Sequence, residues 1–170
     1  MKRLTLMRHA DAGWKDAGLS DVQRPLNRRG TAAAQAMGRR LLELELLPDL
    51  VLASPARRAQ QTAELVAREL SLPPRRLQRE ERLYLASAAD LLASITASAP
   101  RVMHLMVIGH NPGLTELTQL LVPQDPDATL GTAAFCSMAF DCSQWSELAA
   151  AALRDVQRES PPSGFFGLFA

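Results

Sequence analysis

Residues 4–10 of the chain read LTLMRHA, a short hydrophobic run that ends directly in an arginine and a histidine. The run predicts a buried β-strand from Leu4 to Met7. Arg8 carries a fixed positive charge, and His9 can bind or release a proton near neutral pH. Both groups are costly at the end of a buried strand unless a ligand there needs them. An anion, above all a phosphate, would need both, so this stretch predicts an anion site at the end of the first strand.

Two later hydrophobic runs also end in polar residues. The run LVLA precedes SPARR at 54–58, and the run MHLMVI precedes GHN at 109–111. The carboxyl ends of parallel strands meet at one edge of a sheet, where ligands of such folds bind. Ser54-Pro55 and Asn111-Pro112 are typical of helix starts, and helix N-termini favour anions through their free N–H groups. The three strand ends together therefore predict a phosphate site.

Strands alternate with helices along most of the chain. This alternation predicts an α/β fold of three layers, with a largely parallel sheet between two layers of helices. We expect one domain over residues 1–170, whose tail at 160–170 docks on the body or stays mobile. Helical periodicity alone predicts a further helix at 144–157. The expected strands are 4–7, 50–53, a short one near Leu77, 103–108 and 133–140, and the expected helices are 28–46, 54–70, 87–98 and 111–122, with N-caps at Asn27, Ser54, Ser87 and Asn111.

The composition excludes several classes of function. Hydrophobic residues make up 47% of the 170 residues, as in folded globular chains. The net charge is +1, so the charge balance gives no case for a nucleic-acid or membrane partner. The chain has two cysteines, Cys136 and Cys142, no secretory leader and no run long enough to span a bilayer, so we expect a cytoplasmic protein. No Cys/His cluster has zinc spacing, and we expect a monomer.

The stretches LMRHADA, LASPARRAQQTAE and VIGHNP resemble the motifs of the histidine phosphatase superfamily, which has the phosphoglycerate-mutase-like fold. More closely, the chain is similar to the short phosphohistidine phosphatase branch typified by bacterial SixA, from about Leu4 to Phe140. The resemblance implies that the nucleophile is His9 and that Arg8, Arg58 rather than Arg57, and His110 hold the phosphate. It also implies phosphate or substrate contacts for Arg24, in the turn RPL, and for Asn111. The superfamily has glycine after the nucleophile, whereas this chain has Ala10.

The resemblance implies phosphoryl transfer in two steps, through a phosphohistidine intermediate and without a metal or cofactor. The arginines and a protonated His110 would supply the positive charge. Larger members of the superfamily carry a glutamate that protonates the leaving oxygen, and Glu81 is the better placed candidate of Glu80 and Glu81. An imidazole leaving group, whose conjugate acid has a pKa of ~6.5, needs little such help. The stretch 80–87 is too short for the cap of larger members, so an open site and a phosphorylated protein as substrate are expected.

Other interpretations remain open on the sequence. A small-molecule phosphomonoesterase of the same fold would use Glu81 as its acid, and a non-catalytic phosphate-binding module would not need the intact His9. His104 lies inside a strand and is expected to be structural. Asp11, Trp14 and Lys15, in the loop after the first strand, are as easily surface residues as substrate contacts. The superfamily also implies an edge strand at 153–158 after a turn near Trp145, against the helical periodicity.

Overall fold

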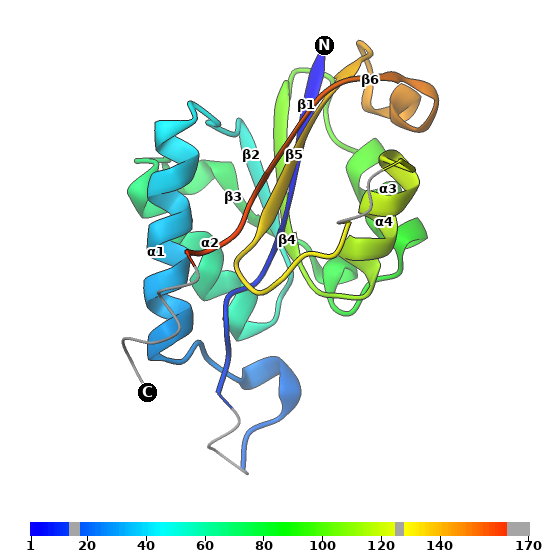
Figure 1. Ribbon diagram of the computed structural model, residues 1–170. Coiled ribbons are helices and arrows are strands. Elements are labelled where there is room, and N and C mark those ends of the chain that lie inside the picture. Colours follow the sequence, from blue (N-terminus) through cyan, green and yellow to red (C-terminus); the bar gives the residue numbers. More distant parts are fainter. Residues whose placement is uncertain (14–17, 125–127, 163–170) are drawn as a thin grey trace.

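The computed structural model describes residues 1–13, 18–124 and 128–162 of the chain. Its six strands form one sheet in the order β3-β2-β4-β1-β5-β6. The strands are β1 (Lys2–Arg8), β2 (Leu50–Ala53), β3 (Leu77–Arg79), β4 (His104–Gly109), β5 (Phe135–Asp141) and β6 (Ala152–Glu159). Helices α1 (Arg28–Glu43) and α2 (Arg57–Glu69) cover one face of the sheet, and α3 (Ala88–Thr96) and α4 (Gly113–Leu121) cover the other (Figure 1).

The buried strands explain the three layers. All six residues of β4 are buried, and the four at 105–108 alternate between two separate hydrophobic clusters. Leu105 and Val107 belong to the cluster under α3 and α4, whereas Met106 and Ile108 belong to the cluster under α1 and α2. Successive side chains of a strand point to opposite faces, so a continuous hydrophobic run needs helices on both sides. The predicted α/β/α architecture is confirmed.

The sheet is parallel where the predicted site lies. Strands β3, β2, β4 and β1 run parallel, and β5 and β6 are antiparallel additions at one edge. In the register of the sheet, Arg8 lies beside Gly109, and Ala53 lies beside Ile108. The residues that follow β1, β2 and β4 therefore leave the sheet at the same edge, as predicted.

The helix starts follow the sequence only in part. Asn27 and Ser87 cap α1 and α3, because their side chains accept hydrogen bonds from Gly30 N and Asp90 N. Helix α2 begins at Arg57, later than predicted, and the prediction of Asn111 as the cap of α4 is wrong. The Asn111 amide instead donates to the Leu130 carbonyl, and its oxygen accepts from Thr115 Oγ1.

The C-terminal part follows the superfamily and not the periodicity. A short 3-10 helix at Trp145–Ala150 leads into β6, which pairs with β5, so the helix at 144–157 is wrong. Trp145 is buried, and its indole N–H donates to Val102 O at 3.0 Å, which ties the turn to the body. Most of the tail lies outside the described residues.

The connection from β3 to α3 is short. It holds only one 3-10 turn, Glu81–Leu83, and no inserted cap. Across the described ranges, no helix is both long and apolar enough to cross a membrane.

Candidate active site

His9 leaves the end of β1 with its ring fixed. Its backbone N–H donates to Gly109 O at 3.1 Å, and its Nδ1 lies 2.7 Å from the carbonyl oxygen of Ala10. A carbonyl only accepts, so Nδ1 carries the proton and Nε2 keeps a lone pair. Burial, together with nearby Arg58 and Arg8, lowers the pKa of His9 to about 4. The ring is therefore neutral at neutral pH, with a free lone pair on Nε2.

The alanine that replaces the usual glycine fits its place. Ala10 is fully buried, and its N–H donates to Thr62 Oγ1 at 3.0 Å. Among the described residues other than glycine, positive φ angles occur at Glu45, Ser71, Leu85 and Ala133. The backbone of Ala10 thus has an ordinary conformation, which a Cβ tolerates.

The loop after Ala10 packs tightly on α1. A Cβ on Gly30 would lie 2.0 Å from the carbonyl oxygen of Asp11, so this turn of the helix requires glycine. The Asn27 N–H donates to that carbonyl oxygen at 3.1 Å, and the Asn27 amide donates to the Asp11 carboxylate at 2.7 Å. Asp11 therefore has a structural contact, while Trp14 and Lys15 lie outside the described residues.

Arg58, from the first turn of α2, reaches both histidines. Its side chain is 3% exposed, and its Nε donates to His9 Nε2 at 3.3 Å. Its Nη2 lies 3.4 Å from His110 Nδ1. Arg57, the preceding residue, is exposed to solvent. The helix thus directs Arg58 and not Arg57 to the two rings.

His110 follows β4 and faces His9, with ring centroids 5.1 Å apart. Its Nε2 is hydrogen-bonded to Ser54 Oγ at 2.6 Å, so the residue predicted to cap α2 instead holds this ring. Burial, His9 and Arg58 lower the pKa of His110 to about 3. The ring is neutral at neutral pH in the site without an anion, and the protonated His110 expected during phosphoryl transfer stays a prediction for the substrate complex.

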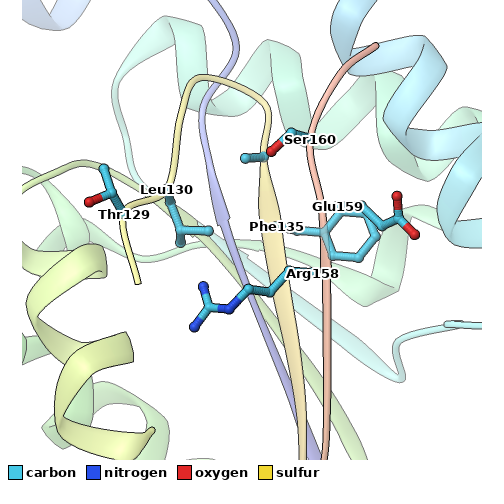
Figure 2. A pocket seen from close by; sticks show the side chains of 7 residues that line it. Thr129, Leu130, Phe135, Arg158, Glu159 and Ser160 are labelled. Carbon is cyan, nitrogen blue, oxygen red and sulfur yellow. The ribbon is translucent and has the colours of Figure 1, made fainter. Parts of the chain in front are cut away.

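Arg8 and Asn111 meet at one carbonyl group. Arg8 Nη1 donates to Leu130 O at 3.3 Å, and Asn111 Nδ2 donates to the same oxygen at 2.7 Å. Burial lowers the pKa of Arg8. Its Nε is also buried and has no hydrogen-bond partner in the described part of the chain. Beside Leu130, a hollow of about 450 Å³ opens, into which Leu130 and Arg158 project (Figure 2).

One carboxylate at the centre of the site was missed by sequence reasoning. Asp21 Oδ2 accepts from Arg58 Nη2 at 3.0 Å and from the Tyr84 hydroxyl at 2.6 Å. Its Oδ1 accepts from Arg24 Nε at 3.1 Å, and its backbone oxygen accepts from Arg58 Nη1 at 2.7 Å. These bonds, the one from Tyr84 first, lower the pKa of Asp21 to about 2. The available signal was its position three residues before Arg24.

Comparisons with known proteins agree with this geometry. The sequence profile described as "Histidine phosphatase superfamily (branch 1)" matches residues 4–84. An uncharacterized protein of Mycobacterium tuberculosis is 36% identical to this chain in a match that covers 68% of this chain and 69% of that protein. The chain belongs to the histidine phosphatase superfamily. An uncharacterized chloroplastic protein of Arabidopsis thaliana is 31% identical over 71% of this chain, but the match spans only 59% of that relative.

Solved structures place the chain in the SixA-type branch of the superfamily. The structure of the protein histidine phosphatase SixA in complex with tungstate matches this chain with a TM-score of 0.78 at 28% sequence identity. The match covers 94% of this chain and 97% of that one. Over this range the chain therefore has the fold of a SixA-type histidine phosphatase.

The remaining predicted residues have partners other than the two site histidines. Glu81 is ion-paired with Arg79 at the surface and is 69% exposed, and Glu80 pairs with Arg82 in the same way. His104 is buried, and its Nε2 lies 2.8 Å from Thr5 Oγ1 within the sheet, in keeping with a structural role. Within the described residues, no group of three or more His, Cys, Asp or Glu side chains could hold a metal ion.

Proposed function

We propose that this protein hydrolyses phosphohistidine on a phosphorelay protein, through a covalent phosphohistidine intermediate on His9. The observation that carries the proposal is the 2.7 Å contact between His9 Nδ1 and the Ala10 carbonyl oxygen. It fixes the tautomer in which Nε2 has the lone pair and faces Arg58. The pKa of about 4 keeps that nitrogen unprotonated across the physiological range.

In the first step, His9 Nε2 attacks phosphorus in line, and the bond from phosphorus to the substrate imidazole breaks. The departing nitrogen keeps the electron pair of that bond. In the second step, water attacks phosphorus, His9 leaves with its lone pair restored, and the water gives up a proton to yield inorganic phosphate. Arg58 Nε, which now donates to His9 Nε2, would move to a phosphate oxygen when phosphorus approaches.

Four side chains would stabilise the charge on the phosphoryl oxygens. Arg58 and Arg8 flank His9, and His110 lies across from it. Arg24 reaches the same cluster through Asp21 and would contact the phosphate at its rim. Such preorganised donors, aimed at developing charge in a partly dry site, typically supply the largest share of catalysis.

The surface position of Glu81 supports a P–N rather than a P–O substrate. Its carboxylate is held by Arg79 and exposed, which is a poor arrangement for an acid that must protonate a buried leaving group. An imidazole can depart with little protonation, whereas an alkoxide, whose parent acid resembles water at a pKa of ~15.7, cannot. The small-molecule phosphomonoesterase is therefore the weaker candidate.

A protein substrate is supported by the short connection between β3 and α3. No cap is inserted there to enclose a small molecule, so a phosphorylated side chain on another protein could approach. SixA, the structural neighbour at 28% identity, is described as a protein histidine phosphatase and binds tungstate, a tetrahedral oxyanion like phosphate. The cytoplasmic location and monomeric state expected from the sequence remain part of this proposal.

The test is a substrate panel on the wild-type protein: a phosphohistidine-carrying protein, phosphoimidazole, a sugar phosphate and p-nitrophenyl phosphate. The highest kcat/KM should fall on the two P–N substrates. A preference for the sugar phosphate would establish the small-molecule alternative. Binding without turnover on every substrate would establish the non-catalytic alternative. Labelling with a radioactive phosphoryl donor, quenched with detergent at alkaline pH because a P–N bond is labile to acid, should also trap phosphate on His9.

A further inference from the structure

The Tyr84–Asp21 pair has no role in the phosphoryl-transfer steps, although it lies in the site. Tyr84 is half-buried, and its ring meets His110 edge-on at a centroid distance of 5.6 Å. Its hydroxyl donates to Asp21 Oδ2 at 2.6 Å. The bond raises the pKa of Tyr84, so the hydroxyl keeps its proton and holds it on the carboxylate.

A hydroxyl whose only proton is committed to a carboxylate can act toward a ligand only as an acceptor. The carboxylate also makes the phenol oxygen more negative, because hydrogen bonds in a chain polarise one another. Tyr84 Oη therefore offers lone pairs for a donor, above all a cationic one. It offers no proton to an oxygen leaving group.

The contacts of Arg58 show on which side of the phosphate site this acceptor lies. Arg58 Nε faces His9 Nε2, whereas its terminal nitrogens, at the other end of the guanidinium, bond Asp21. Tyr84 Oη is attached to that far end through Asp21 Oδ2. In an in-line transfer the leaving group departs on the side opposite the nucleophile. Tyr84 Oη is thus linked to the end of Arg58 that is turned away from His9 Nε2, and the leaving group of an in-line attack by His9 would depart on that side.

We propose that Tyr84, with its proton held by Asp21, accepts a hydrogen bond from the ring N–H of the phosphorylated imidazolium of the substrate and so selects P–N over P–O substrates. This inference rests on the proposed function. A phosphorylated imidazole that is protonated on its second nitrogen leaves as a neutral imidazole when the P–N bond breaks. Its departing nitrogen takes the electron pair, and the N–H stays where it is. An alkyl or aryl phosphate has no such N–H, and its leaving oxygen gains negative charge beside Asp21.

The experiment compares Tyr84→Phe with wild type on phosphoimidazole and on p-nitrophenyl phosphate, with tungstate inhibition as a probe of the phosphate pocket. The phenylalanine keeps the ring against His110 and removes only the oxygen. We expect kcat/KM on phosphoimidazole to fall about 10- to 100-fold, the range for a lost hydrogen bond to a charged group. The aryl phosphate rate and the tungstate inhibition constant should stay within about twofold, since neither probe has an N–H for Tyr84 to accept.

Asp21→Asn provides a second variant, and Asp155→Asn is its matched control. Asp155 also pairs with an arginine, Arg3, but on β6 beside the amino end of β1, away from His9. Asp21→Asn should weaken phosphoimidazole turnover and tighten tungstate binding, because it removes a negative charge beside the anion site. The control should change neither.

Several results would overturn the inference. Equal losses on both substrates with Tyr84→Phe would make Tyr84 a packing residue, and no loss on either would make it a bystander. Failure of the proposed function is visible separately, in the wild type. If unmodified protein turns over p-nitrophenyl phosphate but not phosphoimidazole, the substrate assignment is wrong before any variant is compared, and the inference falls with it.

Discussion

Replacement of Arg58 by alanine should cripple the enzyme, whereas replacement of its neighbour Arg57 should scarcely affect it. The two residues are consecutive in α2 and therefore about 100° apart around the helix. Arg58 is 3% exposed and donates to His9, while Arg57 is exposed to solvent. The pair provides a matched test, since both variants remove one arginine from the same turn of one helix.

The magnitude follows from what Arg58 touches. Loss of one preorganised donor to a transition-state oxygen typically costs about 10²- to 10³-fold in kcat, or ~2.7–4 kcal/mol. Arg58 presents a full positive charge and lies between both histidines, so we expect a loss at or above the upper end of that range. Arg57→Ala should stay within about twofold, as surface substitutions usually do. Arg58→Lys should recover only part of the loss, because an ammonium group cannot reproduce the planar fork.

The assay is kcat/KM on phosphoimidazole, with the melting temperature of each variant as a control for folding. Arg58→Ala should still fold, because Asp21 keeps its hydrogen bonds from Arg24 and Tyr84. The Asp21 side chain is also 39% exposed, so water can solvate the carboxylate that Arg58 leaves. Equal losses in the two alanine variants, or a larger loss at Arg57, would refute the assignment of the phosphate arginine. A collapse in melting temperature confined to Arg58→Ala would show that its role is structural.

Three further outcomes are expected. His9→Ala should abolish turnover and phosphoenzyme labelling while the protein remains folded, and residual phosphatase activity above a trace would place the nucleophile elsewhere. In an NMR titration, the ring chemical shifts of His9 should stay constant from pH 8 to about 5 and reach their midpoint near pH 4. Burial lowers the pKa of His9 to about 4 and so favours the neutral ring above that pH. A midpoint near the ordinary 6.5 would contradict this. Glu81→Gln should change kcat on phosphoimidazole and on an alkyl phosphate by less than about twofold, because the side chain is 69% exposed, and a large loss on either would restore it as the acid.

The layers of the fold could be predicted because the buried strands carry an unambiguous signal. A run such as MHLMVI is apolar on both faces, so it requires helices on both sides of the sheet. The C-terminal region lacks that signal. All residues of β6 are exposed or half-buried, so no continuous apolar run marks this strand. Pairing with β5 decides the structure there, and no local pattern reveals such a long-range partner.

The site divides in the same way. His9, Arg58 and His110 stand directly after strands or at a helix start, so sheet topology alone brings them to one edge. Asp21 and Tyr84 sit in connections whose course depends on tertiary contacts. The 2.6 Å hydrogen bond between the Tyr84 hydroxyl and Asp21 Oδ2 joins residues 63 positions apart in the chain, and neither residue follows a strand end that would have predicted the contact. Glu81 stays a prediction, whereas Tyr84, three residues further along the chain, contacts His110 and carried no signal in the sequence.

The neutral state of His110 follows first from its burial and then from the groups that surround the phosphate position. Burial disfavours the charged ring, and His9, Arg58 and Arg8 add to that effect, so the pKa of His110 is about 3. A phosphoryl group with two negative charges would reverse the sign of the field at this ring and raise its pKa. His110 would then take up a proton only when substrate is present and become a charged donor to the oxygens that induced it. Ser54, hydrogen-bonded to Nε2 at 2.6 Å, leaves Nδ1 as the nitrogen beside Arg58 and the phosphate position. The protonated His110 expected from the sequence is on this argument a property of the substrate complex, whereas the neutral ring belongs to the protein before the anion enters.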